Sequence, residues 1–193
     1  YISVRYAQAY REGAKKEWAE CTNLDELLEE KMSPLFAFWY IHDGRITFEK
    51  RPGSKDWWGE ARTQNKIWLH ANARITDARF IAHEVAHTFE NAMQATLGSK
   101  LGRSSLDTAN LADRDGGFAG GFGEWQWSKD GSNGEVFADM YVGWVGNTWS
   151  EDRKGEARAN HMNEYMPSWI FEMISERRRT SGDIHWKIFV PSR

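Results

Sequence analysis

The chain has 193 residues, of which 40% are hydrophobic and 27% are charged, and its formal net charge at pH 7 is −3. These are ordinary values for one globular domain, and they exclude a largely disordered chain. No apolar run approaches the roughly 20 residues that a membrane-spanning helix needs, so we expect no membrane partner. The sequence pI of about 6.1 gives no broad basic surface, so we expect no nucleic-acid partner either.

The termini and the cysteine content leave the cellular context open. Cys21 is the only cysteine, so the fold must rest on its core or on a metal rather than on an intrachain disulfide. The chain begins at Tyr1 without a methionine, and we interpret it as a processed form or an excised domain. The lack of a signal peptide therefore assigns no compartment, and the sequence leaves the oligomeric state unknown.

The first part of the chain is predicted to form helices followed by a small sheet. Residues 3–20 and 24–31 have the pattern of short helices. The runs 35–41 and 45–50 are rich in β-forming residues, and the Asp43-Gly44 pair between them predicts a hairpin. A further strand is expected at 66–71.

Residues 76–97 are predicted to form one long amphipathic helix. Its apolar residues recur at intervals of four and form one stripe: Ile81, Val85, Phe89, Met93 and Leu97. Thr76 or Asp77 is expected to begin this helix, and Gly98 is expected to end it.

The rest of the chain is predicted to be a glycine-rich loop followed by helices. Residues 113–134 form the loop, and the later elements are helices at 135–149, 151–165 and 167–179 and a final strand at 183–190. Pro167 is expected at the first position of its helix. The prediction is a single α+β domain over 1–193, with a lobe at about 1–98, a glycine-rich connecting loop at about 99–134 and a mainly helical lobe at about 135–193.

A histidine pair on the helix over 76–97 carries the main chemical signal. His83, Glu84 and His87 belong to the sequence HEVAH and share one sector of the helix. The two histidines lie on adjacent turns, away from the apolar stripe, so both imidazoles can reach one zinc ion. Glu84 lies beside that position, where its carboxylate can take a proton from a bound water. The alternative is that both histidines are polar residues of the helix face, satisfied by water or backbone.

A zinc site needs at least a third protein ligand. The glycine and third histidine of metzincins do not follow His87, which excludes that class, and Glu135 is the candidate that remains. Asp139, one turn later, can accept the second ring N–H of a zinc-bound histidine and so fix its tautomer. In the alternative interpretation, Glu135 closes a capping box with the backbone N–H of Ser132, and Asp139 is an ordinary carboxylate on a helix face.

HEVAH followed by EVFAD resembles the gluzincin metallopeptidases, the thermolysin-like clan whose two helices bear HExxH and ExxxD. The resemblance covers roughly residues 65–145, although the two motifs lie farther apart than in thermolysin itself. It implies a zincin-like α+β fold with a small mixed sheet and the active-site helix in the N-terminal lobe. It also implies Zn²⁺ and these roles: His83, His87 and Glu135 as ligands, Glu84 as general base and Asp139 as a support for a ligand. The segment at 65–73 is similar to the edge strand of such enzymes, so a substrate strand is expected to pair along 66–70.

The implied activity is that of a zinc endopeptidase acting on peptide or protein substrates. Gluzincins stabilise the oxyanion of the reaction with a Tyr or His from the C-terminal lobe. The candidates here are Tyr141, His161 and Tyr165, and we favour the last two because they lie four residues apart on one face of a predicted helix.

Two other interpretations remain open. The chain has eleven tryptophans, and a group of them lies among glycines and charged residues: Trp57, Trp58, Trp125 and Trp127. In one interpretation these line the cleft of a non-catalytic binding module, in which zinc is structural or absent. In the other, the chain is a module of a larger protein and the metal serves folding. The presence of Glu84 beside two ligands favours catalysis over the binding module, whereas a loss of secondary structure on chelation would favour a metal that serves folding.

Overall fold

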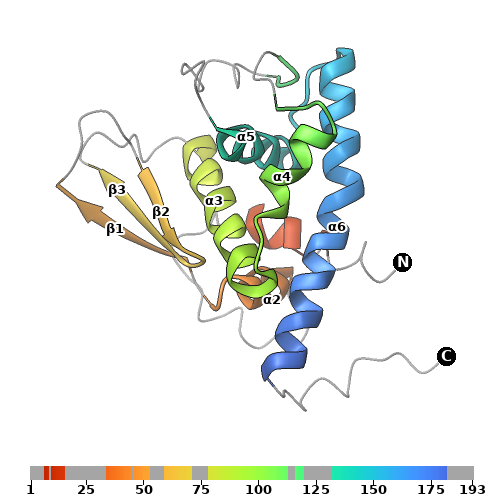
Figure 1. Cartoon of the computed structure of the whole chain (residues 1–193). Coiled ribbons are helices and arrows are strands. Elements are labelled where there is room, and N and C mark those ends of the chain that lie inside the picture. Colours follow the sequence, from red (N-terminus) through yellow and green to blue (C-terminus); the bar gives the residue numbers. More distant parts are fainter. Residues whose placement is uncertain are drawn as a thin grey trace.

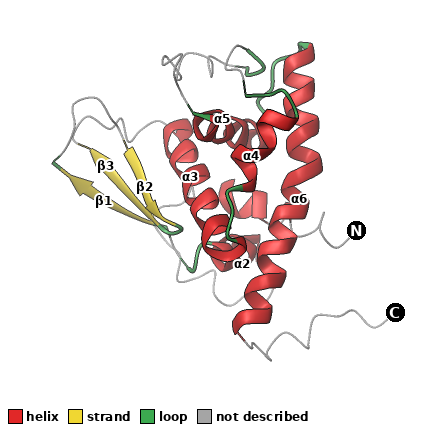
Figure 2. Ribbon diagram, in the orientation of Figure 1, coloured by secondary structure: helices red, strands yellow, loops and turns green. Residues whose placement is uncertain are grey.

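The computed structural model describes residues 7–8, 10–15, 34–44, 46–52, 59–70, 78–112, 116–119 and 132–181. These residues form the expected mixture of α and β structure, with a small sheet beside a larger group of helices (Figures 1 and 2). The predicted helix at 24–31, the strand at 183–190, the start of the helix at 76–77 and most of the glycine-rich loop lie outside the described residues. So do the four tryptophans singled out above.

The sheet has three strands, β1 (Thr47–Arg51), β2 (Gly59–Thr63) and β3 (Lys66–His70), in the order β1-β3-β2. β1 runs parallel to β3, whereas β2 and β3 are antiparallel and are joined by a short turn. Side chains alternate along β3, so Ile67 and Leu69 enter the core while Trp68 faces outward. The sequence predicts β1 and β3, but it did not predict β2, whose GEART run has little β-propensity.

Two helices form the centre of the molecule. α3 (Ala78–Leu97) lies between the sheet and the long helix α6, and it packs closely against α5 (Asn133–Gly146) (Figure 1). The predicted stripe of α3 is confirmed at its centre, where Val85, Phe89 and Met93 are buried, whereas Ile81 and Leu97 at its ends are partly buried. α5 is buried on nearly all sides because α3, a short helix α4 (Leu101–Thr108) and α6 surround it. α4 occupies part of the stretch at 99–134 that was expected to be loop, so that prediction is wrong there.

Residues 35–41, predicted as a strand, form the helix α2 (Pro34–Ile41) instead. Its buried side chains have helical spacing: Ala37, Phe38 and Ile41. Pro34 stands at the first helical position, where its missing N–H costs no hydrogen bond. After the helix, Asp43 has a left-handed φ of 54°, and the N–H of Gly44 donates to the carbonyl of Trp39 at 2.7 Å. The Asp-Gly pair therefore ends a helix and does not form the expected hairpin.

The segment at 151–179 is one helix rather than the expected two. α6 (Arg153–Ser181) continues through Pro167, which removes one hydrogen bond and costs about 3 kcal/mol in a helix interior. The helix continues because its buried stripe extends on both sides of the proline: Met162, Met166, Trp169, Ile170, Met173 and Ile174. None of the helices in the described part of the chain is long and apolar enough to cross a bilayer.

A buried histidine holds the end of α2 against the start of β3. The ring of His42 is fully buried, with Nδ1 2.6 Å from the carbonyl oxygen of Gln64 and Nε2 2.9 Å from the hydroxyl of Tyr10. Burial lowers the pKa of His42 to about 4; the Arg177 charge adds to this shift, while the Gln64 bond and the Asp43 charge oppose it. The ring is therefore neutral at pH 7.

Candidate metal centre

The packing of α3 against α5 brings the predicted ligands together. α3 carries His83 and His87 on adjacent turns, and the first turn of α5 carries Glu135 opposite them. The ligand atoms of these three residues all lie within 4.8 Å of one another. Among the described residues they are the one group of this kind, and the sequence predicted all three.

The distances between the ligand atoms fit a tetrahedral ion. Nε2 of His83 lies 3.2 Å from Nε2 of His87 and 3.0 Å from Oε2 of Glu135, and Nε2 of His87 lies 3.4 Å from the other oxygen of that carboxylate, Oε1. Two zinc–ligand bonds of about 2.0–2.1 Å at a tetrahedral angle place their outer atoms roughly 3.4 Å apart. The residues present therefore fit zinc in both type and spacing.

Asp139 lies behind His83, as predicted. Its Oδ1 is 2.9 Å from Nδ1 of His83, and because a carboxylate only accepts, Nδ1 carries the proton. Nε2 of His83 is thereby directed toward Glu135 and His87. Burial disfavours the charged form of His83, but the bonds to Asp139 and Glu135 outweigh it and raise its pKa to about 10. Burial favours a higher pKa for the Glu135 carboxyl, but the hydrogen bonds and charges of His83 and His87 hold it far below its usual range.

Glu84 has the surroundings of a general base. Glu84 is 6% exposed. Burial raises the pKa of its carboxyl, and the charges of His83 and His87 oppose this shift. The carboxylate accepts a hydrogen bond from the backbone of Ala61 in β2. Its Oε2 is buried without a hydrogen-bond partner among the described residues. A buried carboxylate oxygen of this kind, beside three metal-type ligands, is suited to take a proton from water.

Sequence reasoning missed two further residues at the site, Glu90 and Arg103. The Glu90 side chain is fully buried, and its Oε2 lies 3.9 Å from Nδ1 of His87. Arg103 of α4 donates two hydrogen bonds to the same carboxylate: Nε donates to Oε1 at 2.9 Å, and Nη2 donates to Oε2. The available signal for Glu90 was its position three residues after His87, on the same helix face. No sequence pattern marks Arg103, since α4 was not predicted.

The site opens into a cleft of about 270 Å³. Its lining comes from β2, α3, α4 and the start of α5: Gly59, Glu60, Ala61, Glu84, His87, Asn91, Lys100, Arg103, Ser132 and Glu135. β2 is thus the strand beside the site. The expected pairing of a substrate along 66–70 is wrong, because β3 is the central strand and is hydrogen-bonded on both edges.

The structure does not bring the three candidate oxyanion stabilisers to this cleft. Tyr141 is fully buried in the core, where its hydroxyl lies 2.9 Å from that of Tyr10. His161 is 7% exposed and bonds through Nε2 to Ser105 of α4 at 2.9 Å. Tyr165 is 39% exposed and stacks against Trp169. None of the three is among the described residues that line the cleft.

The capping interpretation of Glu135 has little support in the geometry. Ser132 does occupy the N-cap position of α5, with extended backbone angles, but its side chain makes no capping hydrogen bond. The carboxylate of Glu135 contacts the two histidines.

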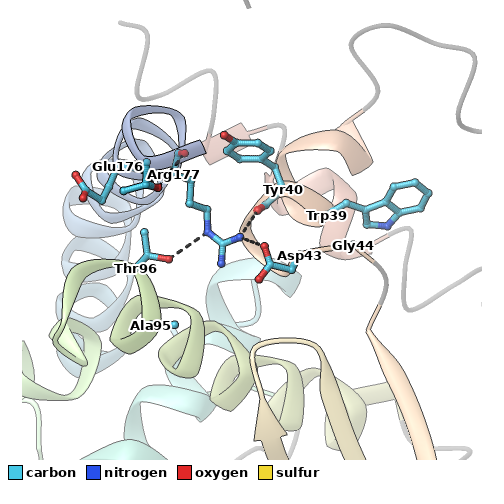
Figure 3. A pocket seen from close by; sticks show the side chains of 9 residues that line it. Trp39, Tyr40, Asp43, Gly44, Ala95, Thr96, Glu176 and Arg177 are labelled. Carbon is cyan, nitrogen blue, oxygen red and sulfur yellow. Dashed lines mark hydrogen bonds and ion pairs between the residues drawn. The ribbon is translucent and has the colours of Figure 1, made fainter. Parts of the chain in front are cut away.

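A larger cavity, of about 650 Å³, lies between α2, α3 and α6 (Figure 3). Arg177 points into it from α6; its Nε lies 3.1 Å from Thr96 Oγ1, and Nη1 lies 2.9 Å from the Tyr40 carbonyl and pairs with Asp43. Arg177 thus ties three helices together. Among the described residues, the group that could hold a metal lies at the smaller cleft and not at this cavity.

Comparison of the chain with protein-family models, with curated proteins and with solved structures finds no match. The function must therefore be argued from the geometry of the cleft.

Proposed function

We propose that this chain is a zinc-dependent peptidase of the gluzincin type with a zincin-like fold. The observation that carries the proposal is that Nε2 of His83 and Nε2 of His87 lie 3.2 Å apart and that each faces one oxygen of the Glu135 carboxylate, at 3.0 and 3.4 Å. The support of His83 by Asp139 strengthens it, and so does the buried Oε2 of Glu84, which has no hydrogen-bond partner among the described residues. A purely structural zinc site would have four protein ligands, whereas three are found among the described residues, and it would have no reason to keep a buried carboxylate beside them.

The proposed reaction is hydrolysis of a peptide bond. A zinc ion held by His83, His87 and Glu135 would polarise the scissile carbonyl and lower the pKa of a water. Glu84 accepts the proton of that water through its unpartnered Oε2 and then delivers it to the leaving nitrogen. The raised pKa of Glu84 suits both steps, since a base with a pKa nearer to neutral also serves as an acid.

The substrate is proposed to lie along β2. Gly59, Glu60 and Ala61 line the cleft, and within the described sheet β2 has an edge that β3 does not cover. An extended peptide can add to such an edge by backbone hydrogen bonds. A Cβ at residue 59 would lie 2.9 Å from Cδ of Glu84, so the strand passes directly over the proposed base.

The test is metal content by plasma mass spectrometry together with hydrolysis of a fluorogenic peptide library. We expect about one zinc per chain in the wild type, and little in His83→Ala and Glu135→Ala. Glu84→Gln should keep its zinc and lose hydrolysis by a factor of roughly 10³ or more. Glu156→Gln, an exposed carboxylate on α6, serves as the matched control and should match the wild type.

Two results would contradict the proposal in different ways. Zinc that remains in Glu135→Ala would mean that the ligand set is wrong. If both ligand variants lose zinc as expected but the wild type cleaves no peptide, the chain is a metal-binding module without peptidase activity.

A further inference from the structure

The wall of the cleft beside Glu135 carries two cations that the proposed hydrolysis does not use. Arg103 and Lys100 both come from the start of α4 and both line the cleft. Nζ of Lys100 donates to Oδ1 of Asn91 at 3.1 Å. A peptidase that bound only backbone and apolar side chains would have no need of two cations here.

The guanidinium of Arg103 is fixed on one side and open on the other. Its Nε and Nη2 donate hydrogen bonds to the buried carboxylate of Glu90, and the backbone N–H of Arg103 also donates to Glu90, at 3.2 Å. Nη1 has no hydrogen-bond partner among the described residues, and the side chain is 35% exposed. The arginine therefore presents one nitrogen to the cleft in a fixed orientation, with little entropy left to lose on binding.

The backbone of α5 leaves room for this arrangement. A Cβ at Gly134 would lie 2.6 Å from Nη2 of Arg103 and 3.2 Å from Nη1. The guanidinium thus packs against the residue that directly precedes the ligand Glu135. Arg103 is also close enough to Glu135 for the carboxylate charge to act on the guanidinium.

Arg103 and Lys100 are the Lys and Arg side chains among the described residues that line the cleft; the carboxylates there are Glu60, which pairs with Arg62, and Glu84 and Glu135, which belong to the proposed metal centre. Glu90 is fully buried and lies against Arg103, so it balances one of the two cations. Lys100 has no carboxylate within ion-pair distance among the described residues; burial and the Arg103 charge lower the pKa of its amine, and the charge of Glu90 opposes this shift. Two cations that approach each other in this way are stabilised when an anion binds between them.

From this geometry we propose that Arg103, assisted by Lys100, binds a carboxylate of the substrate next to the cleaved bond. The inference rests on the proposed peptidase function and adds a specificity to it. The carboxylate is either an Asp or Glu side chain or the C-terminal carboxylate of the peptide, since both present the same acceptor oxygens to an arginine.

The test uses pairs of peptides that differ only in charge. One arm compares Asp with Asn and Glu with Gln at each position near the cleaved bond, and a second arm compares free with amidated C-termini. The readouts are the ratio of kcat/KM within each pair and, on the zinc-loaded Glu84→Gln protein, the ratio of the peptide dissociation constants by fluorescence anisotropy. Wild type should favour the carboxylate by about tenfold or more in one arm, and that arm identifies the source.

The variants separate recognition from structure. Arg103→Gln should abolish the preference, and Lys100→Gln should reduce it by a smaller factor. Because Arg103→Gln leaves the buried Glu90 unpaired, the double variant Glu90→Gln/Arg103→Gln is measured beside it. Arg179→Gln removes a charge from a side chain that is 73% exposed on α6, and it should leave the ratio unchanged.

Each outcome decides between the alternatives. If Arg103 only neutralises Glu90, its variants change stability but leave the ratio intact, and the inference is overturned. The same conclusion follows if the wild type shows no preference. If acidic peptides bind in an Arg103-dependent manner but are never cut, the carboxylate site stands and the proposed hydrolysis fails. If no peptide is bound or cut, both are wrong.

Discussion

Replacing Asp139 tests whether the residues around His83 prepare it to bind a metal. Asp139→Ala removes the oxygen that lies 2.9 Å from Nδ1 of His83, so the imidazole loses the partner that fixes its tautomer and ring orientation. His83, His87 and Glu135 all remain, and any change in metal binding therefore measures the value of that support.

The expected loss of metal affinity follows from the burial and the charge of Asp139 beside His83. Loss of a carboxylate behind a metal-bound histidine typically lowers metal affinity 10- to 100-fold, or about 1.4–2.8 kcal/mol. We expect the upper part of this range for Asp139→Ala, because Asp139 is only 6% exposed and water replaces its oxygen poorly. Asp139→Asn keeps an acceptor oxygen in nearly the same place and should cost about tenfold or less.

The assay is a zinc titration in competition with a chromophoric chelator at neutral pH, with circular dichroism to confirm folding. Asp107→Ala, an exposed carboxylate on α4, is the control and should bind zinc like the wild type. A folded Asp139→Ala protein whose zinc dissociation constant stays within about twofold of the wild type would refute the assigned role of Asp139.

Three other predictions concern stability. In Gly59→Ala the new Cβ would lie 2.7 Å from Cζ of Phe80, so we expect a loss of about 1–3 kcal/mol in the free energy of unfolding by denaturant. Pro167→Ala restores a hydrogen bond inside α6 and should raise that free energy by about 1–2 kcal/mol; a lower melting temperature would contradict it. His42 has a folded pKa of about 4, below the unfolded value of 6.5, so its neutral form stabilises the fold above about pH 6.5, and this contribution is lost as the pH falls toward 4. Between pH 7 and about pH 4.5 the wild type should lose about 2 kcal/mol through this group, and a pH dependence equally steep in His42→Gln would refute the assignment.

The candidate ligands were predictable because their spacing is a local property of helices. His83 and His87 share a helix face through the period of 3.6 residues, and so do Glu135 and Asp139. The helical period alone does not predict that α3 packs on α5. The resemblance to gluzincins implied that packing. The contact between the two helices agrees with that expectation.

The predictions that failed depended on longer-range context. The run at 35–41 is apolar throughout, so it has no period that separates a strand from a buried helix. β2 has weak propensity and exists because β3 and α3 offer it a hydrogen-bonding edge and a surface. Arg103 reaches Glu90 of α3 from α4, a helix that was not predicted from the sequence.

The precision of the metal centre is a consequence of core packing. On α3, Val85 and Ala86 lie between the two histidines and are almost completely buried. On α5, Phe137 and Ala138 lie between Glu135 and Asp139 and are fully buried as well. Each ligand is thus within two residues of a side chain that the close-packed interior fixes, and rigid helices carry that constraint to the ligand atoms. A site with ligand distances near those of a tetrahedral ion can then form from residues 48 positions apart, whatever the length of the loop that connects them.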